Sequence, residues 1–306
     1  MIHNVKKTFW KNERKFPIFL LGTKRSGTTL LQRILNSAED VMIWGEHGGF
    51  LNQIAEAYFL NFEDKTIIRN IPANNALFRP HAKARQLKDA KLWTGWHNYY
   101  SQEDVKNMFA SFISSFFVPA FGKKDRYWGF KETRYGFADR TIEMLAELYP
   151  NAKFIFIIRN PIDIVARLKL SHLRKTTGLE HETNFSLLEE LSAMNKFSTA
   201  EAATKWTQQN YYFVEFSAKN SQRSLIARYE ELVSQEAVAA EIMKWLNISY
   251  SQQKILDILN MKDGRGATST NTKIEFSSLL NEDEISQIKE VTQKVTDKLD
   301  MVKSEA

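Results

Sequence analysis

The chain has 306 residues, of which 43% are hydrophobic and 12% aromatic, enough to bury one large core and to exclude a globally disordered chain. Its formal net charge of +6 suits an anionic ligand, although nucleic acid or an anionic lipid surface would also suit it. Because the chain has no cysteine, disulfides, thiolate metal ligands and a cysteine nucleophile are excluded.

The first apolar run, Phe16–Leu21, is too short for the core of a signal peptide or for a membrane span. No later window reaches the length of a spanning helix. We therefore expect an unprocessed cytoplasmic protein without stable membrane insertion.

Short apolar runs alternate with helical periodicity from this point onward. Phe16–Leu21 predicts a buried strand that leads through a glycine-containing loop into a helix, and Val41–Trp44 predicts a second strand. Residues 47–125 are rich in aromatics at helical spacing. We expect them to form a helical insertion over the active site, within a single domain of residues 1–306.

Three more strands are predicted at Arg126–Glu132, Lys153–Ile158 and Leu225–Tyr229. Asn160 and Pro161 favour a helix start, and Asn281 with Glu284 indicates a capped C-terminal helix. This alternation predicts an α/β fold, with a P-loop-like, mainly parallel sheet flanked by helices and carrying a helical insertion.

The loop after the first strand carries the most informative motif. Gly22 and Gly27 have the spacing of the glycines in the P-loop pattern G-x-x-x-x-G-K-[ST], which directs backbone N–H groups at a phosphate. Thr28 stands where that pattern has lysine, which argues against an ATPase or kinase. Lys24 and Arg25 supply the cations instead, an arrangement that suits a phosphosulfate better than a magnesium triphosphate. An ordinary basic turn is the alternative interpretation.

The segment Lys24–Leu31 resembles the 5′-phosphosulfate-binding loop of sulfotransferases that use PAPS, 3′-phosphoadenosine 5′-phosphosulfate. Its Arg-Ser-Gly-Thr-Thr form is similar to the bacterial and tyrosylprotein branches. The resemblance implies transfer of a sulfuryl group to an acceptor hydroxyl or amine, with PAP as product. It also implies donor contacts from Lys24, Arg25, Ser26, Gly27, Thr28 and Thr29, with Lys24 and Arg25 contributing to catalysis as well.

Three further catalytic assignments follow from the resemblance. Glu46 lies where the tyrosylprotein and heparan sulfate branches have their general base, and the neighbouring His47 is the alternative base. The segment Gly129–Glu132 resembles the strand whose lysine faces the transferred group, which assigns that role to Lys131. A solvated loop carboxylate and a salt-bridged edge lysine are the structural alternatives for Glu46 and Lys131.

The segment Phe154–Asp163 resembles the 3′-phosphate-binding segment of the family, with Arg159 as its arginine. An arginine at the end of a buried strand also requires an anionic partner on physical grounds. The serine that the family usually has further along is replaced by Arg167, and Ser171, one helical turn later, is the other candidate.

Two later segments complete the resemblance. Ala227–Leu232 is similar to a segment near the nucleotide, which implies that Tyr229 contacts the donor; a buried structural tyrosine is the alternative. Gly264–Lys273 corresponds to a basic loop that closes over the donor in the family, with Arg265 and Lys273 as candidates.

The acceptor stays open between a small molecule, a lipid, a carbohydrate and a peptide, and the oligomeric state is unknown from the sequence. A group of aromatics in the insertion either lines an acceptor cleft or packs the insertion onto the sheet: Trp93, Trp96, Tyr99 and Tyr100. No spacing such as H-E-x-x-H occurs, so no catalytic metal is expected.

Two other functions compete with sulfuryl transfer. A P-loop kinase would depend on ATP and magnesium and would need a lysine at Thr28. A non-catalytic nucleotide-binding protein would give Glu46, which has the position of a general base, no functional role. A nucleic-acid partner is not expected, because the basic residues are dispersed and no RNA-binding motif is present.

Overall fold

The computed structural model describes residues 16–65, 68, 101–118, 127–137, 139–178, 196–261 and 276–304. The chain divides into two compact units. The larger unit comprises residues 1–49, 119–137 and 151–306, and the smaller unit comprises residues 50–118 and 138–150. The predicted aromatic group at 93–100 lies outside the described residues.

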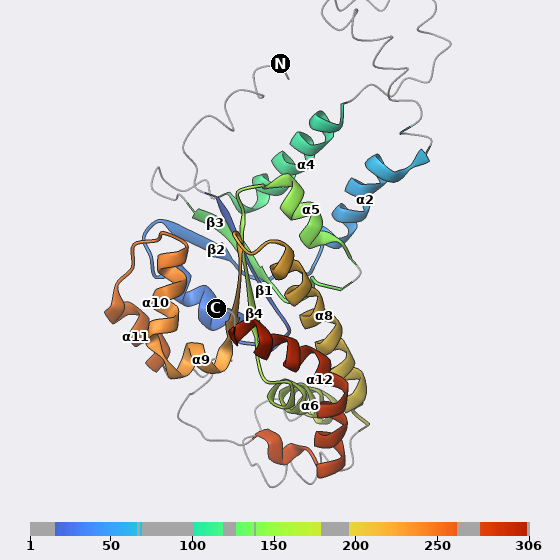
Figure 1. Cartoon of the computed structure of the whole chain (residues 1–306), viewed down its shortest axis with the longest axis vertical. Helices are drawn as coiled ribbons and strands as arrows, with labels where there is room; N and C mark the ends of the chain where they lie inside the picture. Colours follow the sequence, from blue (N-terminus) through green and yellow to red (C-terminus); the bar gives the residue numbers. More distant parts are fainter. Residues whose placement is uncertain are drawn as a thin grey trace, which may run out of the picture. The chain divides into compact units, whose positions relative to one another are not determined.

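A five-stranded sheet forms the centre of the larger unit (Figure 1). Its strands are β1 (Pro17–Gly22), β2 (Val41–Trp44), β3 (Tyr127–Glu132), β4 (Lys153–Ile158) and β5 (Ser224–Arg228). They lie in the order β2-β3-β1-β4-β5, and every neighbouring pair is parallel. The predicted mainly parallel α/β sheet is confirmed.

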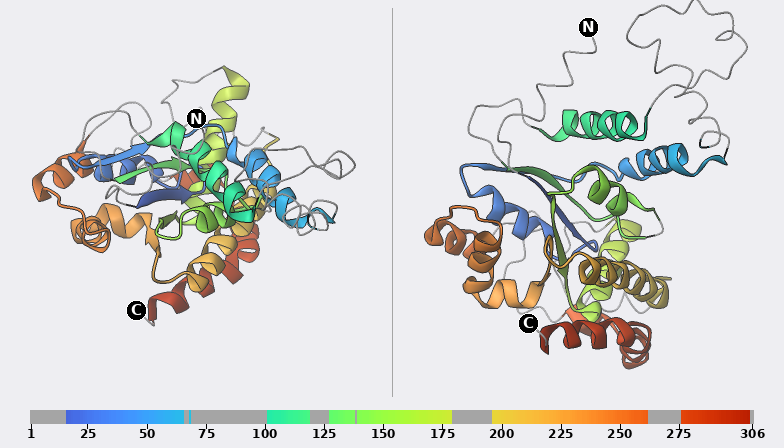
Figure 2. Two further views of the ribbon diagram at one scale, coloured as in Figure 1. Left: turned by 90° about the horizontal axis from the view of Figure 1, so that it is seen from above. Right: turned by 45° about the horizontal axis from the view of Figure 1, so that its top comes forward.

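Helices cover both faces of this sheet (Figures 1 and 2). The first face carries α1 (Thr28–Asn36), α9 (Tyr229–Ser234), α10 (Glu236–Trp245) and α11 (Gln252–Asn260). The second face carries α6 (Pro161–Thr177), α8 (Thr199–Lys219) and α12 (Glu282–Ser304), with the short η3 (Phe276–Leu279) before α12.

Alternation along the strands explains why both faces are apolar. In β4, Ile155 and Ile157 join the core beneath α1 and α10, whereas Phe154 and Phe156 face α8. The ring of Phe156 lies 4.7 Å from that of Phe213 between centroids. A slip of one residue would exchange the two cores, so the register is firmly specified. Because all five strands are parallel, their carboxyl ends meet at one edge of the sheet, where ligands bind in such folds.

Both predicted helix starts are confirmed. The Asn160 side chain accepts a hydrogen bond from the backbone N–H of Ile162 at 2.9 Å, and Pro161 opens α6. At α12, the N–H of Asn281 donates to Glu284 Oε2 at 3.0 Å, and the N–H of Glu284 donates to Asn281 Oδ1 at 2.8 Å. This reciprocal pair is a capping box.

The smaller unit consists of α2 (Leu51–Glu63), α4 (Gln102–Phe117) and α5 (Thr141–Leu148) in its described part. The Tyr149 hydroxyl donates to the carbonyl of Ala110 at 2.7 Å and thereby ties the end of α5 to α4. The predicted insertion at 47–125 covers the first two of these helices, and α5, which follows β3, belongs with them. Its placement over an active site and the single-domain organisation stay predictions.

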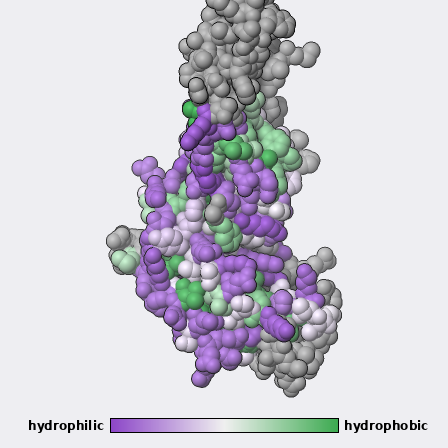
Figure 3. All heavy atoms as spheres, turned by 90° about the vertical axis from the view of Figure 1, so that its right-hand side faces the viewer, coloured by the Kyte–Doolittle hydropathy of each residue, from purple (hydrophilic) through white to green (hydrophobic). Residues whose placement is uncertain are grey.

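In the described part of the chain, no helix has both the length and the apolarity that crossing a membrane requires. Figure 3 shows one face of the molecule, on which hydrophilic side chains predominate and hydrophobic ones form scattered patches. The expected cytoplasmic location stays a prediction.

Gly129 lies where β1 and β3 approach closely, opposite Ile18. A Cβ at this glycine would lie 1.8 Å from the carbonyl oxygen of Ile18, so alanine has to push two central strands apart. We predict that Gly129→Ala lowers the free energy of unfolding by about 1–3 kcal/mol or more, measured by chemical denaturation. Gly45→Ala is the control, because no atom lies within 4 Å of its new Cβ. Equal stability of the two variants would contradict the prediction.

Candidate active site

The loop between β1 and α1 has the backbone conformation of an anion-binding turn. Arg25 and Gly27 are left-handed, with φ of 72° and 101°, and flank Ser26. The N–H of Ser26 donates to the carbonyl of Thr23 at 3.1 Å and closes the turn. Such alternation directs successive N–H groups toward one point. Gly27 caps α1 without a side-chain hydrogen bond, and the first turn of α1 holds no acidic residue, which leaves the positive end of the helix dipole for a ligand.

Tyr229 sets the position of this loop. A Cβ at Gly27 would lie 2.2 Å from the ring of Tyr229, so only glycine permits this approach. The guanidinium of Arg159 lies 3.9 Å from the centroid of the same ring. Tyr229 is itself buried, and it is not among the residues that line the neighbouring pocket. It thus packs the loop and Arg159 together, in line with the structural alternative for this tyrosine.

A pocket of about 320 Å³ is lined by this loop and by residues at the carboxyl edge of the sheet. Its charged lining consists of six basic side chains and one carboxylate: Lys24, Arg25, Arg33, Lys131, Arg159, Arg167 and Glu46. Leu30 of α1 and residues at the end of α11, Ile258, Leu259 and Met261, form an apolar part of the wall. This excess of positive charge indicates an anionic ligand with an apolar portion.

Arg159 and Arg167 lie on the β4–α6 segment and line the same pocket. Arg159 directly follows β4, is 5% exposed, and donates to Asp163 Oδ2 at 2.8 Å. Burial and then repulsion by Arg159 lower the pKa of Arg167 to about 10, and Asp163 offsets this only in part. Two mutually repelling positive charges therefore line the same pocket, which favours binding of an anion there.

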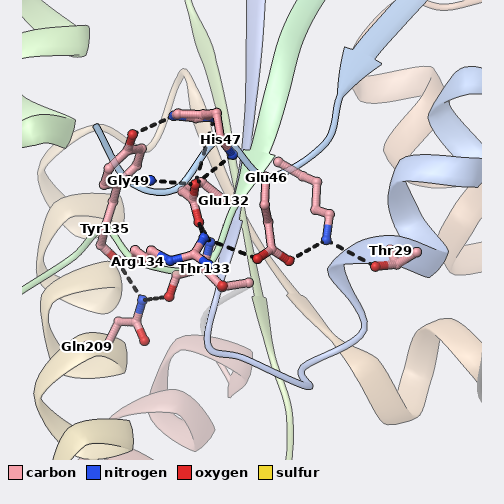
Figure 4. A network of polar contacts seen from close by, with 10 residues as sticks. Thr29, Glu46, His47, Gly49, Glu132, Thr133, Arg134, Tyr135 and Gln209 are labelled. Carbon is pink, nitrogen blue, oxygen red and sulfur yellow. Dashed lines mark hydrogen bonds and ion pairs between the residues drawn. The ribbon is translucent and has the colours of Figure 1, made fainter. Parts of the chain in front are cut away.

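Glu46 lies between two cations (Figure 4). The Nζ of Lys131 donates to Glu46 Oε1 at 2.7 Å and to Thr29 Oγ1 at 3.1 Å, and Nη1 of Arg134 donates to Glu46 Oε2 at 3.2 Å. Burial raises the pKa of Glu46, but the hydrogen bond and charge of Lys131 and the charge of Arg134 outweigh burial and lower it overall. Glu46 is therefore an ionised carboxylate at neutral pH.

Glu132, which no sequence motif singled out as a site residue, is the centre of the same network (Figure 4). It is fully buried at the end of β3 and accepts hydrogen bonds from four donors: the N–H groups of His47, Gly49 and Thr133, and Nη1 of Arg134. These bonds measure 2.7–3.1 Å. Glu132 thereby fixes the loop that carries Glu46 and holds Arg134 where it contacts Glu46.

His47, the predicted alternative base, has other contacts. Its Nε2 lies 2.5 Å from the hydroxyl of Tyr135, and its ring meets the edge of Phe130 at 4.6 Å between centroids. Burial lowers the pKa of His47, although the carboxylate of Glu132 opposes this. His47 is not among the described residues that line the pocket. This geometry favours Glu46 over His47 as the group that faces a ligand.

The remaining predicted residues differ in their positions. Ser26 is fully buried in the loop, and its Oγ has no hydrogen-bond partner among the described residues. Thr28 and Thr29 line the pocket at the start of α1. Ser171 lies 3.5 Å from Nη2 of Arg25 but lines a second cavity instead. Arg265 and Lys273 lie outside the described residues.

Several pocket residues were not assigned to the site from the sequence, although Leu30 lies within the motif Lys24–Leu31: Leu30, Arg33, Thr133, Ile258, Leu259 and Met261. Leu30 and Arg33 lie one to two turns beyond the phosphate loop on α1, so their helical spacing from Gly27 could have indicated them. Within the described ranges, no group of three or more potential metal ligands occurs.

The chain belongs to the sulfotransferase family, whose sequence model matches residues 17–252. Phosphate loop, Glu46, Lys131 and Arg159 all lie within the matched part. No curated protein sequence matches the chain significantly.

Several solved sulfotransferase structures are similar over most of this chain. The sulfotransferase domain from the curacin biosynthetic pathway is 17% identical, with 94% of this chain and 99% of that one covered and a TM-score of 0.49. The sulfotransferase domain of the Synechococcus PCC 7002 olefin synthase is 16% identical, with coverage of 92% and 96% and a TM-score of 0.45. Mouse sulfotransferase SULT7A1, solved in complex with PAP, is 12% identical, with coverage of 91% and 83% and a TM-score of 0.45. Similarities at this level carry no argument about the acceptor.

Arg134 is one of the two cations that lower the pKa of Glu46. We predict that Arg134→Gln raises the pKa of Glu46, because the charge is lost while the amide can still donate to Glu132. A carboxylate with a depressed pKa stabilises the fold above the pKa it has when unfolded, and this contribution disappears as the pH falls through the folded pKa. The variant should therefore lose that contribution at a higher pH than the wild type. A ¹³C-NMR titration of Glu46 measures the shift.

Arg140→Gln is the control for this titration, since it removes one positive charge from an exposed pair with Glu63. An unchanged Glu46 titration in Arg134→Gln would show that Arg134 does not act on this carboxylate.

Proposed function

We propose that this protein transfers the sulfuryl group of PAPS to an acceptor hydroxyl, with Glu46 as the general base. The observation that carries the proposal is the pocket at the phosphate loop, in which six basic side chains and an apolar wall surround one carboxylate. Membership of the sulfotransferase family supports the class of reaction. The lining of the pocket further supports a donor that carries two separate anionic groups and a nucleobase with apolar faces.

Each part of such a donor has a matching part of the pocket. The phosphosulfate suits the left-handed turn and the N-terminus of α1, next to Lys24 and Arg25. Arg159 and Arg167 suit the 3′-phosphate, whose charge would relieve the repulsion that lowers the pKa of Arg167. The adenine suits the apolar wall at the end of α11.

PAPS supplies the sulfuryl group, and the side chains at the carboxyl edge would promote its transfer. Glu46 would take the proton of the acceptor hydroxyl as the new S–O bond forms and the S–O bond to the 5′-phosphate breaks, leaving PAP. Lys131 has three N–H donors, of which Glu46 and Thr29 engage two. The third would stabilise negative charge on the transferred group or on the leaving phosphate.

The acceptor would enter through a second cavity of about 550 Å³. Lys24 and Thr133 line both this cavity and the donor pocket, so the two spaces meet beside the phosphate loop. An acceptor in the second cavity would therefore lie next to the sulfuryl group.

The donor assignment predicts tight binding of PAP that does not require magnesium. Replacing Arg159 or Arg167 by alanine should weaken this binding about 10- to 100-fold, because each removes charge-assisted hydrogen bonds to a phosphate. Calorimetry with PAP and with ATP, each with and without magnesium, makes the measurement.

Arg228→Ala is the matched control for these variants, because Arg228 pairs with Asp300 and does not line the pocket. Circular dichroism establishes that Arg159→Ala, which opens a buried site, is folded. Magnesium-dependent binding of ATP without any response to PAP would overturn the proposal in favour of the kinase alternative.

The role of Glu46 predicts a separate effect on the chemical step. Glu46→Gln should lower kcat by about 10²- to 10⁴-fold, the usual contribution of a general base, while leaving the affinity for PAP unchanged. Glu241→Gln, on the exposed surface of α10, controls for loss of one carboxylate. Undiminished kcat in Glu46→Gln would show that another group takes the proton.

A further inference from the structure

The second cavity is built from α6, α8 and residues 196–198 just before α8, together with residues of the phosphate loop and of the turn after β3. The rim includes Lys175 at the end of α6, Lys196 just before α8, and Lys205 on α8. Lys24 lies at the junction with the donor pocket. The cavity is thus bordered by lysines contributed by four different segments.

Among the described residues that line this cavity, positive charges outnumber negative ones. Glu201 is the only carboxylate among the lining residues described, and it already pairs with Lys205 at 2.6 Å. Lys175 and Lys196 make no ion pair with any residue that the structure describes. Both side chains are exposed to solvent and neither lines the donor pocket. A nucleotide in that pocket would therefore not pair with these two lysines, and no carboxylate of the described residues does so.

The interior of the cavity differs from its rim. Trp206 and Ile164, both almost fully buried, and Phe197 provide apolar surface. The Oγ1 of Thr23 is buried and has no hydrogen-bond partner within the described part of the chain. The amide of Gln209 donates to the carbonyls of Thr133 and Tyr135, and its oxygen points away from these contacts (Figure 4). The cavity thus has an apolar interior beneath a cationic rim, with Thr23 and Gln209 among its lining residues.

We propose that the second cavity selects a small acceptor that carries a carboxylate together with its hydroxyl group. The carboxylate lies at the rim near Lys175 and Lys196, and the ring or chain of the acceptor packs against Trp206 and Phe197. The hydroxyl extends toward Lys24 and Thr133. The role of this molecule as acceptor rests on the proposed sulfuryl transfer, whereas its binding does not.

The size of the cavity favours a small molecule over a polymer. About 550 Å³ lies within the range of 300–1,000 Å³ typical of sites that enclose most of a small ligand. An apolar floor of this kind contributes to binding in proportion to the apolar area that the ligand removes from water. The rim lysines then add discrimination between charged and neutral ligands more than total affinity.

The test compares binding of matched compounds in the presence of saturating PAP, which removes the donor pocket as an alternative anion site. A set of hydroxyaryl and hydroxyalkyl carboxylates and the primary amide of each serve as probes in ligand-observed NMR. We expect the carboxylates to bind more tightly than their amides. The double variant Lys175→Met and Lys196→Met should weaken carboxylate binding about five- to tenfold and leave amide binding unchanged.

Lys289→Met, on the exposed face of α12, controls for the loss of positive charge alone. Raising the salt to about 0.5 M should reduce binding of the carboxylates only, because exposed charges are screened. Equal binding of carboxylates and amides, no bound carboxylate in the set, or carboxylate binding that survives in the double variant would overturn the inference. Binding of an acidic peptide or polysaccharide in preference to every small carboxylate would overturn it as well.

Two outcomes separate this inference from the proposed function. PAP binding and sulfuryl transfer to neutral hydroxyl compounds, without preference for carboxylates, would sustain the function and overturn the inference. Carboxylate binding that depends on the rim lysines, without any binding of PAP, would sustain the cavity assignment and overturn the function.

Discussion

Repulsion among basic side chains at the carboxyl edge of the sheet is the constraint on which the rest of the site depends. The parallel sheet brings the ends of β1, β3 and β4 together, and each end is followed by a cation: Lys24, Arg134 and Arg159. The pKa of Arg167 is lowered for a related reason, since burial and the nearby positive charge of Arg159 both disfavour its charged form. Because the described carboxylates at this edge are fewer than the cations, binding of a multiply charged anion would stabilise the arrangement.

The carboxylates present at this edge have separate tasks. Asp163 forms an ion pair with Arg159 and offsets part of its charge. Glu132 accepts hydrogen bonds from backbone N–H groups and from Arg134. Of the carboxylates that the structure describes, only Glu46 lines the pocket beside the β1–α1 loop. Its two cationic neighbours keep it ionised, and the hydrogen bonds of Glu132 keep its loop in place. The proposed general base is thus positioned by a buried carboxylate that is not among the described residues lining the pocket.

The sequence was sufficient for features determined within a short segment. The strand at 153–158 coincides with β4, and the glycines around Lys24 lie in the predicted turn between β1 and α1. It was not sufficient for contacts between distant segments. The hydrogen bonds of Glu132 to residues 47 and 49 cross more than eighty residues of chain, so no local pattern reports them. The apolar wall at Leu259 depends equally on how α11 packs against α1.

The choice between Glu46 and His47 shows why neighbouring residues are hard to separate by motif alone. Glu46 falls at the place where the family resemblance expects a base, and His47 is the neighbouring alternative. In the folded chain, Glu46 reaches Lys131 and the donor pocket, whereas His47 packs on Phe130 and Tyr135. The distinction arises from the direction of the loop, which the bonds to Glu132 determine. Because the same bonds place Arg134 against Glu46, one buried carboxylate governs both the position and the ionisation of the proposed base.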